Sequence, residues 1–579
     1  MSVRVTIQAG VDDEAFRTPP PPGEEQRRAA RLKSQQRADR FRSLAAIGLM
    51  VLAFLAVSGQ LIRLSMSGQE QERLSVNAPM ATAFARPDIV DRKGRLLAGD
   101  VVMPSLFADP KIILDVDEAA TKLAGVLPDI DVDRVREAIS DRDKRFVWLR
   151  RGLSPAQAQK VHDLGLPGLS FRQELRRAYP LGRLAGHVLG YVDIDNKGRA
   201  GIEHYLDRVK HVDAVHGASL SGKAPLRLTL DVAVQFAVED ELATALKRYK
   251  AKAASALVMD VRNGDIVAAV SLPGVDPVVS SQRFERARID RLTQGTYELG
   301  SIFKTMTVAL ALEQGHTLET VVDVRKPLEV ESYTIKDLHP AGRPLSVAEI
   351  FLKSSNVGSG LLALGAGQDA QEAFLERLGL LGDLATEAGS VAKPTRPAVW
   401  GEIETVTVSY GHGLAVSPLQ FVAASAPLIN GGYLVKPRFV AQTHDGEQLS
   451  QERKQVVSAE TSRQIRAIMR WNVAGKVGTG SRADVPGLRL GGKTGTAEIA
   501  GVGGYQEEAV ISSFLSAFPM DAPSYVMLVS LFEPQGTKET KGKITAGLNA
   551  APTTARIASR IAPLLGFIPG PAVEAVVDR

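Results

Sequence analysis

Ser301 and Lys304 have the residue types and the spacing of a nucleophile and its base. They begin an apolar run through Leu310 that predicts a helix, and residues three apart on a helix share one face. An alcohol needs an adjacent base near neutral pH, and a desolvated lysine has a lowered pKa and can serve as that base. The start of the helix would also offer backbone N–H groups to a developing oxyanion. The pair therefore predicts nucleophilic catalysis by a serine.

The Ser-x-x-Lys spacing is weak evidence for catalysis when taken alone, because roughly one or two copies arise by chance in a chain of this length. A second copy is present at Ser390 and Lys393. Gly389 precedes that serine and Pro394 follows that lysine, and both oppose a continuing helix. Ser301 is therefore the candidate nucleophile.

Two further patches follow Ser301 along the chain. Ser354 and Asn356 come directly after a predicted helix and offer a hydroxyl and an amide two residues apart. A later strand-like run reads Gly491-Gly-Lys-Thr-Gly-Thr496, in which glycine lets a ligand approach the backbone closely. Its Lys493 and its hydroxyls can hold an anion, and the spacing does not fit a Walker phosphate loop.

The pattern of predicted elements indicates an α+β fold. An Asn-Gly turn at 263–264 joins two apolar runs, which is a strong hairpin signal. Helical stretches follow from 301 to about 460, and strand-like runs return near the C-terminus before a last helix. Strands at both ends with helices between them predict one sheet assembled from distant segments. The late strands are predicted at 488–496, 513–518 and 525–531, and the last helix at 553–565.

The N-terminal region has the pattern of a membrane anchor. Seven basic residues against one acid lie between Arg27 and Arg42, and the next 20 residues, Ser43–Ile62, carry no charge. Twenty helical residues span about 30 Å, which is the thickness of the hydrocarbon layer. A cleaved signal peptide is the alternative, but its apolar core is shorter. The basic segment from Arg27 to Arg42 predicts that the N-terminus is cytoplasmic and that the chain after the apolar segment lies on the other side of the membrane.

The composition argues against a disulfide-bonded, a metal-binding and a nucleic-acid-binding protein. The chain of 579 residues has no cysteine, so neither a disulfide nor a cysteine-ligated metal is expected. The nine histidines lack metal-ligand spacing, and neither a metal nor a cofactor is expected. The net charge of +5 is concentrated before the apolar segment, which gives little support to nucleic-acid binding.

In this order, Ser-x-x-Lys, Ser-x-Asn and Lys-Thr-Gly resemble the active-site motifs of penicillin-binding proteins and serine β-lactamases. Residues 86–98 and 179–203 resemble the N-terminal motifs of class B penicillin-binding proteins, and 409–420 and 478–480 resemble their transpeptidase motifs. The stretch 411–420 is most similar to the division-specific type. The two arginine-rich N-terminal patches also suggest buried ion pairs at a domain junction, with solvated loops as the equal alternative for either patch alone.

The resemblance implies four segments: a cytoplasmic tail at 1–43, a transmembrane helix at 44–63, a non-catalytic pedestal at 64–225 and a transpeptidase domain at 226–579. The last of these would combine an antiparallel sheet covered by helices with an all-helical subdomain. It would lie outside the bacterial inner membrane, in the periplasm. The resemblance further implies a septal peptidoglycan D,D-transpeptidase inhibited by β-lactams, with a membrane-embedded glycosyltransferase and other division proteins as partners.

The resemblance also implies a role for each site residue. Ser301 would attack the penultimate D-Ala carbonyl of a stem peptide, and Lys304 would take its proton. Ser354 would relay a proton to the leaving D-Ala, oriented by Asn356 and Lys493. The terminal carboxylate would be bound at the remaining residues of the Lys-Thr-Gly run, Thr494, Gly495 and Thr496, and the backbone N–H groups of Ser301 and Thr496 would form the oxyanion hole.

Three alternatives remain at this stage. A carboxypeptidase or β-lactamase would pass the acyl group to water, but no water-activating glutamate segment is evident between 356 and 493. An anchored scaffold or β-lactam sensor would have a slow or silent site. An elongation-type transpeptidase would share the chemistry and differ in its place of action.

Overall fold

The computed structural model describes residues 48–60, 85–209, 224–442, 454–475, 477–501 and 504–567. These belong to two compact units, 1–80 and 81–579, each described by itself. In the first unit, residues 48–60 are helical. No helix among the described residues is both long enough and apolar enough to cross a membrane. The ends of the predicted span, 44–47 and 61–63, and the whole basic segment from Arg27 to Arg42 lie outside the described residues.

The second unit begins with a small mixed module around a long hairpin-like pair of strands. β2 (Leu96–Ala108) pairs with β4 (Leu169–Ala178) along most of its length. β1 (Ile89–Val90) pairs antiparallel with β2 and parallel with β7 (Leu226–Arg227). Three helices pack beneath this sheet around buried Leu106, Leu123 and Ile139. The elements are β1 (Ile89–Val90), β2 (Leu96–Ala108), α3 (Val116–Val126), α4 (Val132–Ser140), β3 (Val147–Arg150), α5 (Pro155–His162), β4 (Leu169–Ala178), α6 (Gly186–Leu189), β5 (Tyr191–Val192), β6 (Gly198–Ala200), α7 (Gly201–Arg208) and β7 (Leu226–Arg227).

Buried ion pairs are present and join the two arginine-rich patches, but they lie between residues 86 and 207 of the N-terminal module and not at the predicted domain junction. Glu203, at the start of α7, accepts from Arg86 Nε at 3.0 Å and from Arg177 Nε at 2.6 Å. Arg177 also donates to Asp100 at 3.1 Å, and Arg86 pairs with Asp207. The side chains of Arg177 and Glu203 have no exposed surface. The network fixes α7 against β2 and β4.

The central sheet of the catalytic region has five antiparallel strands in the order β16-β17-β18-β8-β9. The predicted hairpin is confirmed as β8 (Ala253–Asp260) and β9 (Ile266–Leu272), and Gly264 in its turn has φ +80°. The other strands are β16 (Gly491–Gly501), β17 (Gly504–Phe518) and β18 (Tyr525–Phe532). The sheet therefore joins segments more than 200 residues apart, as predicted.

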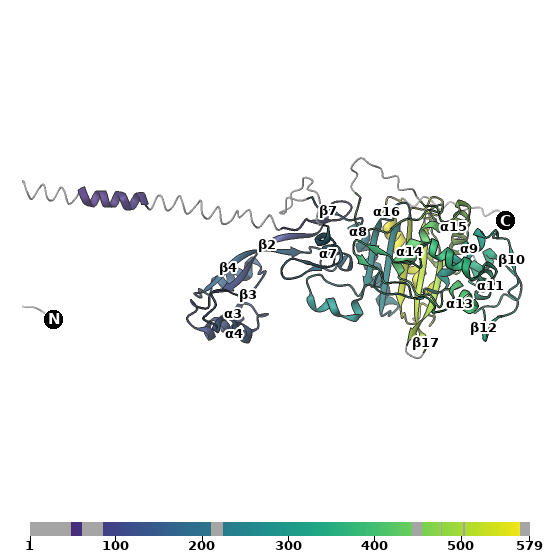
Figure 1. Cartoon of the computed structure of the whole chain (residues 1–579), viewed down its shortest axis with the longest axis horizontal. Helices are drawn as coiled ribbons and strands as arrows, with labels where there is room; N and C mark the ends of the chain where they lie inside the picture. Colours follow the sequence, from purple (N-terminus) through teal and green to yellow (C-terminus); the bar gives the residue numbers. More distant parts are fainter. Residues whose placement is uncertain are drawn as a thin grey trace, which may run out of the picture. The chain divides into compact units, whose positions relative to one another are not determined.

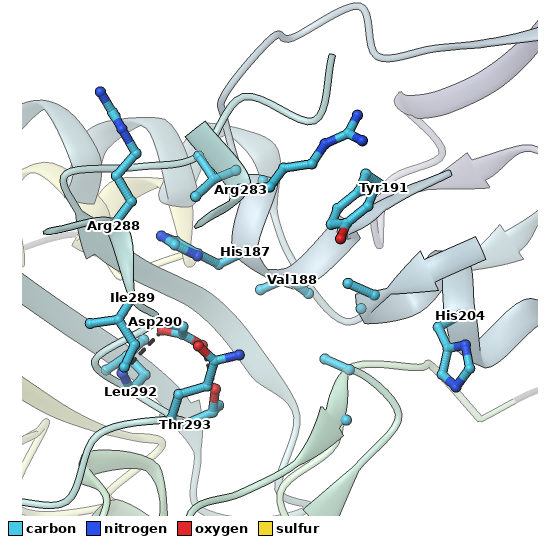
Figure 2. Close-up of a pocket in the computed structure, with 18 of the residues that line it drawn as sticks. His187, Val188, Tyr191, His204, Arg283, Arg288, Ile289, Asp290, Leu292 and Thr293 are labelled. Atoms are coloured by element: carbon cyan, nitrogen blue, oxygen red, sulfur yellow. Dashed lines mark hydrogen bonds between the residues drawn. The ribbon is translucent and has the colours of Figure 1, made fainter. Parts of the chain in front are cut away.

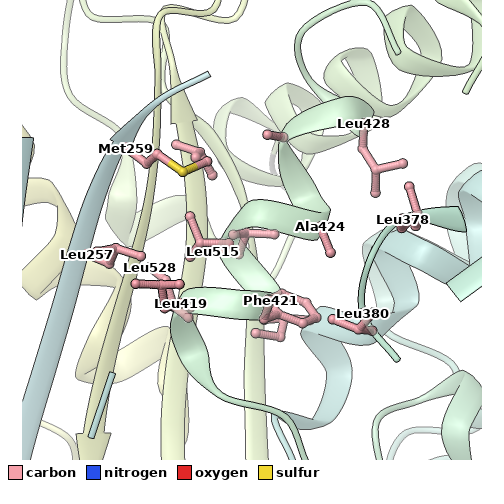
Figure 3. Close-up of a cluster of buried hydrophobic side chains, with 14 of the residues drawn as sticks. Leu257, Met259, Leu378, Leu380, Leu419, Phe421, Ala424, Leu428, Leu515 and Leu528 are labelled. Carbon is pink, nitrogen blue, oxygen red and sulfur yellow. The ribbon is translucent and has the colours of Figure 1, made fainter. Parts of the chain in front are cut away.

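Helices cover both faces of this sheet (Figure 1). On one face, α8 (Val232–Arg248) and α16 (Ala550–Leu564) form a core with the strands. On the other face lies α14 (Pro418–Ser425), in which every residue is buried. Figure 3 shows Leu419 and Phe421 of this helix between the strand residues Leu257 and Leu528 and the loop residue Leu380. Its two polar side chains, Gln420 and Ser425, donate hydrogen bonds to backbone carbonyl oxygens, and its other residues are apolar, as expected for a fully buried helix.

The remaining helices form a subdomain that is not all-helical, contrary to the prediction. The helices are α9 (Lys304–Glu313), α10 (Val347–Lys353), α11 (Asn356–Ala366), α12 (Gln368–Arg377), α13 (Glu402–Ser409) and α15 (Ala459–Ala474). Between them lie three two-stranded ribbons: β10 (Val321–Val322) with β13 (Leu345–Ser346), β11 (Leu328–Val330) with β12 (Tyr333–Ile335), and β14 (Ala385–Thr386) with β15 (Gly389–Ser390). These strands are two or three residues long, which is too short for the alternation that identifies a strand.

Candidate active site

Ser301 lies in a 3-10 turn, Gly300–Phe303, and α9 begins only at Lys304. The 3-10 turn still aligns side chains three apart, so the predicted shared face is kept. Strand β16, at the edge of the sheet, approaches this turn closely. A Cβ on Gly495 would lie 2.5 Å from the Leu299 carbonyl oxygen, so only glycine fits there. The glycine of the Lys-Thr-Gly motif thus brings the strand against the turn that holds Ser301.

Lys304 is fully buried and its ammonium group is surrounded by acceptors. Its Nζ donates to the Ser354 carbonyl oxygen at 2.6 Å, to Ser354 Oγ at 3.1 Å and to Asn356 Oδ1 at 2.7 Å. These bonds use all three hydrogens of a charged lysine. A neutral Lys304 has two hydrogens and a lone pair, so it can keep two of these bonds and accept a proton.

Ser354 lies between two buried lysines. Lys493 Nζ donates to Ser354 Oγ at 3.0 Å, so the hydroxyl bridges Lys493 and Lys304. Ser354 ends α10 in the left-handed region, with φ +59° and ψ +42°. A non-glycine residue rarely adopts this conformation, and such strain is concentrated at functional sites. The strained backbone directs the hydroxyl into the site.

Burial depresses the pKa values of both lysines. Burial holds the pKa of Lys304 well below its ordinary value, the charge of Lys493 lowers it further, and Asp337 opposes the shift. Burial lowers the pKa of Lys493 to about 7. The arrangement therefore supplies a lysine that can lose its proton near neutral pH beside a hydroxyl, as a general base requires.

Asp337 organises the site and was not predicted from the sequence. Its carboxylate accepts from Ser355 Oγ at 2.6 Å and from the backbone N–H groups of Asn356 and Val357 at 2.5 and 3.0 Å. It thus satisfies free N–H groups at the start of α11 and fixes the Ser-x-Asn segment. Asp337 lies 19 residues before Asn356 in a loop, and no local pattern marks it.

Replacing Asp337 with alanine is expected to slow acylation at the site. Hydrogen bonds to a charged group are worth about 1.5–3 kcal/mol, so losing one should lower the acylation rate about 10- to 100-fold through displaced Ser354 and Asn356. The measurement is the rate of labelling by a fluorescent penicillin. Asp323→Ala removes an exposed carboxylate from the same region and serves as the control. An unchanged rate in Asp337→Ala would show that the segment is fixed by other contacts.

The Lys-Thr-Gly strand is held on its other side by the Gly-Thr-Gly stretch at 478–480. Thr494 Oγ1 lies 2.7 Å from Thr479 Oγ1, and Asn472 accepts from the Thr479 N–H at 3.0 Å while donating to Gly492. The Thr496 hydroxyl accepts from the Ala546 N–H at 3.2 Å and keeps its own O–H for another acceptor. The structure therefore brings both predicted carboxylate-binding threonines beside the buried lysine.

The other sequence candidates occupy different environments. Ser390 lies in the ribbon strand β15, and Lys393 pairs with Asp383 at 2.8 Å on the surface, so this copy of the motif does not form a helical pair. His412 is packed near the site, where burial lowers its pKa while Glu298 and Glu498 act in the opposite direction. His339 is exposed.

Comparisons with known proteins agree with this arrangement. Residues 254–553 match the model of the penicillin-binding protein transpeptidase domain, and residues 82–210 match that of the penicillin-binding protein dimerisation domain. The probable peptidoglycan D,D-transpeptidase FtsI of Caulobacter vibrioides is 37% identical over 83% of this chain and 82% of its own. The probable peptidoglycan D,D-transpeptidase PenA of Neisseria meningitidis is 31% identical over 84% and 85%, and the peptidoglycan D,D-transpeptidase FtsI of Escherichia coli 29% over 88% and 89%.

A dimerisation module followed by a serine transpeptidase module defines a class B penicillin-binding protein. The chain belongs to the penicillin-binding protein transpeptidase family, and within it to the FtsI type.

Proposed function

We propose that this chain is a septal peptidoglycan D,D-transpeptidase that cross-links stem peptides through an acyl-enzyme on Ser301. The observation that carries the proposal is the network of Lys304, Ser354, Asn356 and Lys493, which lies within the residues that match the transpeptidase family. Its two lysines have depressed pKa values, and its bridging hydroxyl can pass a proton between them. The names of the similar FtsI proteins support the substrate and the septal role.

In the first half-reaction, neutral Lys304 takes the proton of Ser301 Oγ. The oxygen forms a bond to the penultimate D-Ala carbonyl carbon, and the backbone N–H groups of Ser301 and Thr496 stabilise the oxyanion by about 3 kcal/mol each. The C–N bond to the terminal D-Ala then breaks. The leaving nitrogen receives a proton from Ser354 Oγ, which is resupplied by the adjacent lysines. Thr494 and Thr496, with the close backbone approach at Gly495, hold the terminal carboxylate.

In the second half-reaction, an amine of a neighbouring stem peptide attacks the ester carbonyl. Its nitrogen forms an amide bond to the carbonyl carbon and loses a proton to the lysine and serine network. The ester C–O bond then breaks, and Ser301 Oγ regains its proton from that network. β-Lactams present a strained amide to the same serine, and their ring opens to an ester that the amine does not resolve. The cycle needs no cofactor.

The depressed pKa values predict a bell-shaped pH dependence of acylation. The rate should rise with pH as Lys304 loses its proton, and fall above about pH 7 as Lys493 loses its charge. In Lys493→Met the neighbouring charge is gone, so the pKa of Lys304 rises and the acid limb moves to higher pH, while the basic limb disappears. The measurement is the acylation rate against pH. A mutant acid limb that stays in place would show that the two lysines do not interact.

We further propose that residues 44–63 anchor the protein in the bacterial inner membrane with its catalytic domain in the periplasm. The uncharged run and the basic lead before it support this topology. The substrate polymer lies just outside that membrane, where a septal glycosyltransferase and other division proteins would be the partners. A fusion to a fluorescent protein should gather at the septum. Uniform labelling along the cell sides would instead indicate an elongation-type enzyme.

The test of the proposed reaction is incubation of the full-length protein with glycan strands bearing D-Ala-D-Ala pentapeptides. Mass spectrometry of the digested products should find cross-linked dimers and one released D-Ala for each cross-link. Tetrapeptides without cross-links would indicate a carboxypeptidase. Intact substrate with a folded, penicillin-labelled protein would favour a scaffold or sensor.

A further inference from the structure

A cavity of about 630 Å³ lies between the N-terminal module and the catalytic module, within the unit 81–579. Its lining comes from residues 186–208 of the first module and mainly from 269–294 of the second. We propose that this cavity binds a small polyanion with two or more carboxylate or phosphate groups, which bridges the two modules. Figure 2 shows His187, Tyr191, Arg283 and Arg288 around the opening.

The wall of the cavity has an excess of positive charge. Four arginines line it: Arg208, Arg283, Arg286 and Arg288. Only two acidic residues line it, Glu285 and Asp290, and both already accept hydrogen bonds. Glu285 accepts from Arg288 Nε at 2.7 Å, and Asp290 accepts from the Leu292 N–H and the Thr293 hydroxyl of its own turn. Among the described residues, neither Arg208 nor Arg286 has an ion-pair partner, so the cavity retains cations that an anion can neutralise.

Two nitrogen atoms in the wall also lack hydrogen-bond partners although they are buried. Within the described part of the chain, His187 Nε2 and Arg283 Nε have no partner. A buried polar atom without a partner costs about 1–3 kcal/mol, so such atoms are uncommon and call for an explanation. Neither nitrogen faces the open cavity in this conformation, so a ligand oxygen reaches them only when the His187 and Arg283 side chains turn toward it. The two residues come from different modules.

The Arg283 side chain is already fixed in place for this role. Its guanidinium lies 4.0 Å above the Tyr191 ring, and its Nη2 donates to the Pro277 carbonyl oxygen at 2.7 Å. A planar guanidinium held in this way loses little freedom on binding and presents its remaining donors to carboxylate or phosphate. The Arg283–Tyr191 contact also crosses between the modules, so a ligand here would strengthen an existing junction.

The size of the cavity decides between a single ion and a larger ligand. Pockets of about 300–1,000 Å³ hold small organic molecules, and this one is far larger than one chloride needs. The lining arginines are hydrogen-bond donors and carry positive charge. The ligand class is therefore a small polyanion, and its acidic groups are carboxylates or phosphates.

The test is titration calorimetry of the full-length protein with citrate and, separately, with inorganic pyrophosphate, in chloride buffer of constant ionic strength. At least one of them should bind once per chain. Removing a single charge-assisted hydrogen bond should weaken that binding about tenfold or more in Arg286→Gln. Arg142→Gln removes an exposed arginine far from the cavity in the sequence and should leave the affinity unchanged.

Both variants should label with penicillin as the wild type does, which shows that they are folded. Binding of citrate alone identifies carboxylate as the recognised group, binding of pyrophosphate alone identifies phosphate, and binding of both indicates a general oxyanion site. Absence of binding by either probe, or equal binding by Arg286→Gln and wild type, would overturn the proposal.

Discussion

Lys304→Met is expected to lower the rate of Ser301 acylation by about 100- to 10,000-fold, which is the contribution of a positioned general base. Methionine fills a similar volume but has neither a donor nor a basic lone pair. Lys304 has no exposed surface, and its three acceptors on Ser354 and Asn356 would lose their common donor. The expected loss therefore combines the missing base with a looser proton relay. The measurement is the time course of labelling by a fluorescent penicillin.

Lys353→Met is the matched control for this prediction. Lys353 directly precedes Ser354 in the chain but is exposed and lies outside the network. It should label at nearly the wild-type rate. If Lys304→Met also labelled within a few-fold of wild type while remaining folded, another group would have to take the serine proton.

Glu203→Gln is expected to destabilise the protein by about 3–5 kcal/mol, the usual cost of breaking a buried ion pair by removing one charge. Glu203 is the acceptor shared by Arg86 and Arg177, and neither its side chain nor that of Arg177 is exposed. Glutamine has the same shape as glutamate but no charge, so the buried guanidinium groups of Arg86 and Arg177 lose the negative charge that they share. Urea unfolding of the full chain, followed by tryptophan fluorescence, measures the loss.

The surface pair between Asp117 and Arg136 provides the comparison. Asp117 is 77% exposed, and breaking such a pair by Asp117→Asn should cost at most about 1 kcal/mol. An equally small effect of Glu203→Gln would mean that the buried network does not hold α7 against the sheet, and that apolar packing does so alone.

The parts of the fold that follow local rules were predictable from the sequence. The Asn263-Gly264 turn between two apolar runs predicted the β8–β9 hairpin, and the apolar run 525–531 predicted β18. The arginine-rich patches left buried ion pairs and solvated loops as equal alternatives, and the structure shows that Arg86 and Arg177 form buried ion pairs with Glu203. Short ribbons such as β11–β12 have too few residues to produce a pattern.

The site depended on contacts that no local pattern specifies. The spacing of Ser301 and Lys304 predicted a shared face, but the hydrogen bonds of Lys304 run to a segment 50 residues later. Asp337 acts on Asn356 only because the intervening chain folds back on itself. The cavity beside His187 and Arg283 likewise exists only where two modules meet, so neither segment reveals it alone.

The most direct test of the account is labelling with a fluorescent penicillin in wild type, Ser301→Ala and Ser390→Ala. We expect one covalently bound penicillin per chain in wild type and in Ser390→Ala, and none in folded Ser301→Ala. Label that persists in Ser301→Ala, or that disappears in Ser390→Ala, would contradict the assignment of Ser301 as the nucleophile and with it the proposed mechanism.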